Sequence, residues 1–212
     1  MLGFAKAAAL AAGIFLVSVP GVSAAPMLSI NSGADYALPG SFDPGISGVA
    51  DGETIKVFFD GSAGGLELLN GPGSLLFTYL GKEAGYTNVA ISGVEIFRTG
   101  TTVAGATAIV DVAVAGSSFV PLQFKSVTGG LRQATNGGPI DAGAGLGFLQ
   151  KGSIFYAFFD DGGSGGGTCG TGDCDFDDLI MSIQVVPLPA AGLLLLGGLG
   201  GLGFVSRKRK AA

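Results

Sequence analysis

The pattern of apolar and polar residues changes twice along this chain. An uninterrupted apolar run stands near each end, and between the two runs short segments alternate apolar with polar residues. Alternation with a period of two is typical of strands that bury one face, and Gly, Asp, Asn and Pro separate the segments. The central region has no good helical period. The pattern therefore predicts an all-β domain between two segments of another kind.

Eight segments of this central region are predicted to be strands. Five alternate clearly and three more weakly: Glu53–Asp60, Ser74–Leu80, Thr107–Ala115, Ser153–Phe159 and Leu179–Val185, then Asn88–Phe97, Phe119–Lys125 and Leu146–Gln150. About eight strands with turn residues between them fit an antiparallel β-sandwich best. A short helix around Gly81–Gly85 is an alternative that we do not favour. Tyr79 and Tyr156 fall on apolar faces and are expected in the core.

The N-terminal run has the three zones of a secretory signal peptide. Lys6 precedes the apolar run Ala7–Val19, Pro20-Gly21 ends that run, and Val22-Ser23-Ala24 fits the small-x-small cleavage rule. We predict a signal peptide over residues 1–24, cut after Ala24 or Ala25. An uncleaved anchor is the alternative, and the shortness of the run disfavours it. The chain is therefore expected to be exported through the inner membrane.

The C-terminal run predicts a transmembrane segment. Ala190–Val205 is uncharged, and with Pro187–Pro189 and Ser206 the uncharged stretch reaches the length of about 20 residues that spans a bilayer. A basic tail follows at once: Arg207, Lys208, Arg209 and Lys210. Such a cluster stays on the cytoplasmic side of a membrane. The tail is therefore expected to stop transfer and to anchor the chain.

A short proline motif precedes that segment and carries a resemblance. The motif Val186, Pro187, Leu188, Pro189, Ala190, followed by the apolar span and the basic tail, resembles the PEP-CTERM sorting signal of Gram-negative bacteria in its VPLPA-CTERM variant. The resemblance covers residues 186–212 only. It implies processing by an exosortase, a transient membrane anchor, and a final place at the cell surface or in the extracellular matrix, with exopolysaccharide or biofilm as surroundings. The motif has no Glu, which leaves the exosortase subtype open, and an ordinary C-terminal anchor is the alternative.

Residues 25–185 remain as one domain, long enough to bury a core. All 16 acidic residues of the chain fall in it against six basic ones, a net charge of −10. So acidic a domain repels nucleic acid and attracts cations. The chain has no His, which excludes a Ser-His-Asp triad, a Cys-His dyad and His-ligated zinc.

Six aspartates gather near the end of this domain. If the strands before and after the glycine-rich loop form a hairpin, the carboxylates meet at one end of it: Asp160, Asp161, Asp173, Asp175, Asp177 and Asp178. Calcium takes six to eight oxygen ligands from such loops, so we predict a calcium site. The remaining positions of an EF-hand are missing. A solvated turn is the alternative interpretation of the aspartates. Glu83 is a further carboxylate that could join them, but for this residue a solvated turn is the interpretation we favour.

A second resemblance concerns the same hairpin. Many PEP-CTERM surface proteins carry a similar acidic stretch just before the sorting signal, matched here by Asp173, Asp175, Phe176, Asp177, Asp178 and Leu179. Calcium binding is what this resemblance implies. Cys169 and Cys174, the two cysteines of the chain, are predicted to form a disulfide, as expected of a cysteine pair in an exported protein.

Three classes of function follow from these observations. A non-enzymatic surface or matrix protein, sorted by an exosortase and stabilised by calcium, is the interpretation we favour. A calcium-dependent carbohydrate-binding module or adhesin is the alternative. A glycosidase with two carboxylates is disfavoured, because the acidic residues share one turn and the chain has no Trp to form a sugar platform.

Overall fold

The computed structural model describes residues 27–39, 48–83, 85–113, 116–162 and 174–187. In these residues every regular element is a strand, and every strand pairing is antiparallel. The all-β, antiparallel class predicted from the sequence is confirmed. None of the described residues forms a helix long and apolar enough to cross a membrane. The predicted signal peptide (1–24) and nearly all of the predicted sorting segment (186–212) lie outside the described residues.

The strands form three sheets. The largest has seven, in the order β2 (Ala34–Ala37), β3 (Thr54–Phe58), β12 (Gly145–Lys151), β13 (Ile154–Asp160), β14 (Leu179–Val186), β5 (Gly73–Gly81) and β8 (Thr107–Val112). The second has β11 (Gln133–Thr135), β10 (Gln123–Ser126), β6 (Asn88–Ser92) and β7 (Val94–Arg98). The third has β1 (Met27–Ser32), β4 (Gly64–Leu69) and β9 (Ser118–Phe119).

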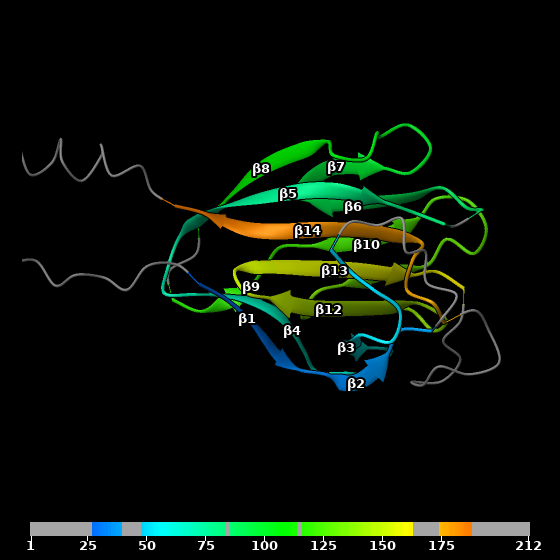
Figure 1. Cartoon of the computed structure of the whole chain (residues 1–212), viewed down its shortest axis with the longest axis horizontal. Helices are drawn as coiled ribbons and strands as arrows, with labels where there is room; N and C mark the ends of the chain where they lie inside the picture. The colour runs from blue at the N-terminus through cyan, green and yellow to red at the C-terminus, as the bar shows by residue number, and fades with distance from the viewer. Residues whose placement is uncertain (1–26, 40–47, 84, 114–115, 163–173, 188–212) are drawn as a thin grey trace, which may run out of the picture.

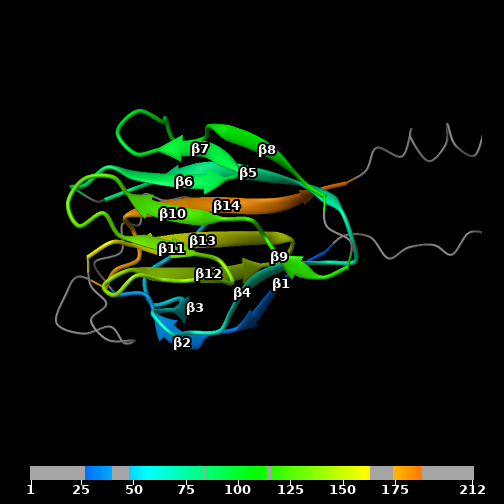
Figure 2. The same cartoon turned by 180° about the vertical axis from the view of Figure 1, so that it is seen from behind.

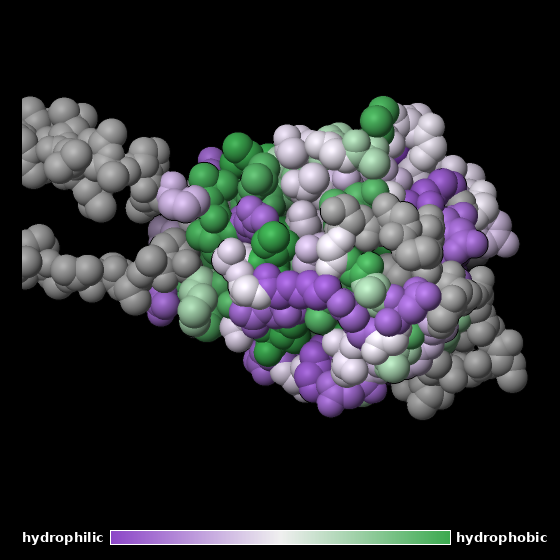
Figure 3. Space-filling model, viewed as in Figure 1, coloured by the Kyte–Doolittle hydropathy of each residue, from purple (hydrophilic) through white to green (hydrophobic). Residues whose placement is uncertain are grey.

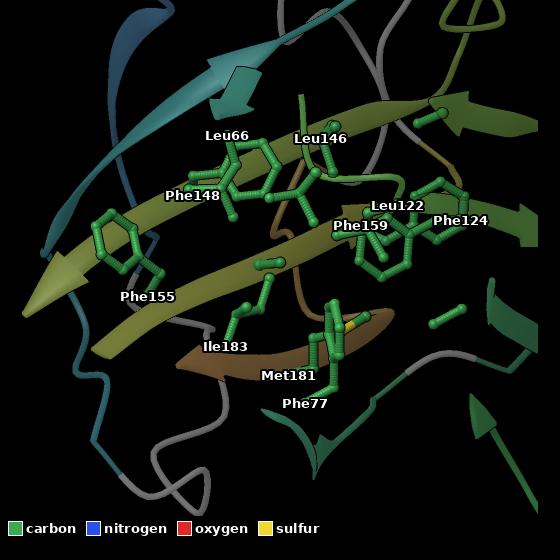
Figure 4. Packing of buried hydrophobic residues seen from close by; sticks show 14 of the residues in the cluster. Leu66, Phe77, Leu122, Phe124, Leu146, Phe148, Phe155, Phe159, Met181 and Ile183 are labelled. Carbon is green, nitrogen blue, oxygen red and sulfur yellow. The ribbon is translucent and has the colours of Figure 1, made fainter. Parts of the chain in front are cut away.

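The main core lies between the seven-stranded sheet and the other two (Figures 1 and 2). Figure 4 shows aromatic and aliphatic side chains of several strands meeting there. Phe124 of β10 stacks on Phe159 of β13 with ring centroids 5.4 Å apart, and Tyr79 of β5 lies 5.8 Å from Phe97 of β7. The sheets therefore face each other through interdigitating side chains.

The other face of the seven-stranded sheet is also covered over its central strands. Tyr156, Phe158 and Ile180 form a second buried cluster with Leu38 and Phe176, which come from the connections between strands. Tyr79 and Tyr156 are buried, as predicted. Strand β13 is buried along both faces, because residues that alternate with Tyr156 and Phe158 lie in the main core. The expectation of a strand with one apolar face was therefore too narrow for β13, and also for β14, whose Ile180 belongs to the second cluster.

The structure has more strands than the eight expected. Strands β1, β2, β4 and β11 were not predicted, because they are short or contain polar residues and glycine. The segment Asn88–Phe97 is two strands, β6 and β7, joined by a tight turn at Gly93, whose φ of +73° suits glycine. Phe119–Lys125 likewise divides between β9 and β10. The described residues of the Gly81–Gly85 stretch are not helical.

Candidate functional site

The predicted acidic hairpin is present. Strands β13 and β14 pair antiparallel, with Phe159 opposite Leu179, so that Asp160 and Asp161 leave one strand where Asp177 and Asp178 enter the other. The carboxylates therefore gather at one end of the sheet, the right-hand end in Figure 1. Asp173 and Cys169 lie outside the described residues. The disulfide with Cys174 and the place of Asp173 in the site stay predictions.

A third strand adds a carboxylate from the middle of the chain. Strand β5 pairs with β14 and contains a bulge, since Gly81 faces Ile180 while Tyr79 faces Met181. Bulges commonly redirect the chain beside functional sites. Beyond the bulge, the backbone N–H of Glu83 donates to the carbonyl oxygen of Asp177 at 2.9 Å. This bond fixes Glu83 against the hairpin.

Glu83, Asp175 and Asp177 form a group that could hold a metal ion. One carboxylate oxygen from each lies within 4.8 Å of the others. Oxygen ligands bind calcium at 2.3–2.6 Å, so two ligands of one ion lie at most about 5 Å apart. Glu83 is exposed, as expected of a turn residue, and Asp175 is half-buried. Asp177 is only 1% exposed, and its Oδ2 accepts no hydrogen bond from the described residues.

Phe176 explains why Asp177 is buried. Its ring is fully buried, with centroids 5.4 Å from that of Tyr36 and 6.0 Å from that of Phe59. Its φ is +60°, a conformation that a bulky side chain adopts at a cost of about 1–3 kcal/mol. Next to it, the Tyr36 hydroxyl donates to the carbonyl oxygen of Cys174 at 2.6 Å. Contacts at Cys174 and at Phe176 thus hold this segment. The core therefore positions the carboxylates of Asp175 and Asp177, on either side of Phe176.

The other predicted ligands take part in a hydrogen-bond network. Asp178 Oδ2 accepts from the backbone N–H of Asp161 at 2.5 Å, and Asp161 Oδ2 accepts from Asn88 Nδ2 at 2.6 Å. Asp160 Oδ1 accepts from the backbone N–H of Gly162 at 2.9 Å. Arg132 Nη1 donates to the carbonyl oxygen of Asp161 at 2.5 Å. Asn88 belongs to β6 of the four-stranded sheet and Arg132 to the loop between its strands β10 and β11, so that sheet helps to fix the hairpin.

Burial and mutual repulsion change the protonation of two of these carboxyl groups. Burial, the charge of Asp175, and contacts with Glu83 and Asp175 raise the pKa of Asp177 to about 9. Burial raises the pKa of Asp178 to about 8; a hydrogen bond from the backbone of Asp161 opposes this, and the charges of Asp161, Asp160 and Asp175 add to it. Both groups therefore hold protons at neutral pH unless a cation compensates their charge.

A cavity of about 320 Å³ opens beside the carboxylates. Among the described residues, five acidic ones line it: Glu83, Asp161, Asp175, Asp177 and Asp178. Tyr86, Gly85 and Gly162 line it as well. From the sequence, Glu83 was a possible partner carboxylate for which a solvated turn was favoured, and Tyr86 was not expected here. The contact of β5 with β14 joins segments about 100 residues apart. A cation at the three carboxylates would be accessible from this cavity.

Comparisons of the chain with protein-family models, with curated proteins and with solved structures found no match.

Proposed function

We propose that this chain is an exported, non-enzymatic protein of the cell surface or extracellular matrix, with an antiparallel β-sandwich stabilised by calcium at Glu83, Asp175 and Asp177. The observation that carries the calcium site is the buried carboxylate of Asp177. Its Oδ2 is removed from water without a hydrogen-bond donor among the described residues, and it lies against two further carboxylates. Such an arrangement costs stability unless a cation or a proton neutralises the charge.

Calcium suits this donor set better than other metals. All the donors are carboxylate oxygens, which favour hard cations over zinc or copper. Magnesium demands near-ideal octahedral geometry and keeps most of its water, whereas calcium accepts irregular sites. The hydrogen bonds to Asp160, Asp161 and Asp178 hold the hairpin around the ion. The face-to-face packing of the antiparallel sheets supports the sandwich.

The ends of the chain supply the proposed destination. The signal peptide directs export through the inner membrane, the C-terminal span holds the chain there transiently, and an exosortase cuts at Val186–Ala190. The charge of −10 on the exported domain keeps it soluble in the matrix and attracts cations. Association with exopolysaccharide follows from the resemblance of the sorting signal.

A thermal melt in 1 mM calcium and in EGTA tests the calcium site. With free calcium at 100 times the Kd, binding adds about 2.7 kcal/mol to the free energy of unfolding. For a domain of this size, that corresponds to a rise in Tm of about 5–10 °C. Asp175→Asn should reduce this rise strongly, while Asp51→Asn, an exposed aspartate outside the site, should keep it. Identical melting curves in calcium and in EGTA would contradict the proposal.

A further inference from the structure

The cavity beside the carboxylates has one wall that metal binding does not use. That wall is Tyr86, which lines the cavity and is 48% exposed. The other described residues that line the cavity are acidic, apart from Gly85 and Gly162. A half-exposed aromatic ring adjoining a cation site is a combination that neither solubility nor folding requires.

The ring of Tyr86 is held in place by the loop between β10 and β11. It packs over Gly129, where an added Cβ would lie 2.8 Å from three of the ring atoms. The φ of Gly129 is +82°, so this position favours glycine both for its backbone and for the space. The backbone of Tyr86 is fixed too, since its carbonyl oxygen accepts from Thr99 Oγ1 and Lys82 Nζ, each at 3.4 Å. The ring is therefore a preorganised surface.

Three carboxylates leave part of the coordination shell of a calcium ion open. Calcium takes six to eight oxygens, and water fills positions that the protein does not supply. Asp177 lines the cavity, and its Oδ2 is buried and has no hydrogen-bond partner among the described residues. The ion would therefore lie at the cavity wall, with its open positions toward the space that Tyr86 borders.

We propose that this cavity binds one residue of a neutral sugar, with two adjacent hydroxyl groups on the calcium ion and the apolar face of the pyranose against Tyr86. This inference rests on the calcium site of the proposed function. Vicinal hydroxyls replace two waters of the ion without a change of charge. The aliphatic C–H groups of a pyranose find an apolar partner in the aromatic ring.

Charge and size decide the class of sugar. Five acidic residues line the cavity and no basic residue does among those described, so one divalent ion leaves the site negative. Uronic acids and sulfated or phosphorylated sugars are therefore repelled. A volume of about 320 Å³ is at the small end of the range for ligand sites, which fits one sugar residue rather than a long segment.

Retention of the purified full chain on immobilised mannan and galactan tests this inference. In 1 mM calcium we expect retention that EGTA or free D-mannose or D-galactose reverses, and no retention on alginate, which is acidic. Tyr86→Ala should weaken binding about tenfold, whereas Tyr86→Phe should keep most of it. Both variants should keep the rise in Tm that calcium causes in the parent protein.

Two glycine variants supply a matched control. Gly129→Ala places a Cβ against the ring of Tyr86 and should weaken sugar binding as Tyr86→Ala does. Gly100→Ala introduces the same backbone strain, since its φ is +84°, but its Cβ meets no atom within 4 Å, so sugar binding should persist. A calcium-dependent Tm without retention on either neutral polymer would overturn this inference and leave the proposed function standing. Absence of the calcium effect itself would overturn the proposed function, and retention that survives EGTA would overturn the sugar site.

Discussion

Asp177 is the residue that we expect to determine how the proposed site responds to protons and to calcium. Its carboxylate is buried beside those of Asp175 and Glu83, which raises its pKa to about 9. In the metal-free protein the folded state therefore holds a proton that the unfolded state releases above about pH 4. Asp178 acts in the same direction, with a pKa of about 8. The stability that these protons give the fold is complete below about pH 4 and is lost as the pH rises toward 8–9.

The upward direction of these two pKa shifts predicts how the Tm in EGTA depends on pH. The Tm of the parent protein should fall between pH 5 and pH 8, and Asp177→Asn should fall less over the same range, because its amide does not titrate. Calcium should raise the Tm of the parent more at pH 8 than at pH 5, since protons compete for the same oxygens. A difference between parent and variant that is constant from pH 5 to pH 8 would show that Asp177 is ionised in the fold.

At the scale of elements, the β13–β14 hairpin and the bulge of β5 bring the carboxylates together, and Phe176 connects them to the core. Because Phe176 packs in the second buried cluster, the position of Asp175 and Asp177 depends on a contact across that cluster. Glu83, Asp175 and Asp177 thus lie in segments that directly adjoin β5 and β14, and a buried aromatic ring fixes one of these segments to the core.

Phe176→Leu tests this connection. The smaller side chain should cost about 1–2 kcal/mol of stability and should also reduce the calcium-induced rise in Tm, because the carboxylates lose their support. Phe124→Leu is the matched control: Phe124 is equally buried but belongs to the main core. It should lower the Tm in EGTA by a similar amount and keep the calcium response. An unchanged calcium response in Phe176→Leu would mean that the carboxylates are positioned without the ring.

In the whole molecule, the proposed calcium site and the proposed sorting motif lie at opposite ends of strand β14. The carboxylates lie where β14 begins, and the proline motif begins at Val186, where β14 ends. Eight residues of strand place these ends about 25 Å apart. Strand β1 starts at the same end as β14 finishes, so a chain held at its C terminus would present the acidic end away from the membrane (Figure 1). Apolar residues are more prominent over β8, where Ile109 is 65% exposed, than over the acidic end (Figure 3).

Sorting is tested in cells that contain an exosortase of the matching subtype. The parent protein should lose its C-terminal segment and leave the inner membrane, whereas a variant with alanine at Val186–Pro189 should keep the segment and remain in the membrane fraction. Mass spectrometry of the C terminus and fractionation measure both effects. As a control, the same variant should keep the calcium-dependent Tm, since the motif is far from the carboxylates. Release of the alanine variant at the parental rate would contradict exosortase processing.

The sequence by itself determined the local features of this protein. Residues two positions apart decide which face of a strand is apolar, so alternation located β5 and β8 with their buried sides, including Tyr79, and the face of β14 that lies in the main core. The same reasoning anticipated the antiparallel hairpin that joins Asp160 and Asp161 to Asp177 and Asp178. Short strands with glycine or polar residues, such as β2 and β4, carried too weak a pattern to be found.

Only the tertiary structure decided which groups share the site. Strand order depends on how whole faces are buried, so the neighbourhood of β5 and β14, and with it Glu83, could not be read from spacing. The same holds for Asn88 and Arg132, which reach Asp161 from the second sheet. Burial divided the aspartates into a group around Asp177, for which we propose cation binding, and a group around Asp178 that hydrogen-bonds within the hairpin. Identical residue types acquire different chemistry because packing sets their exposure and their neighbours.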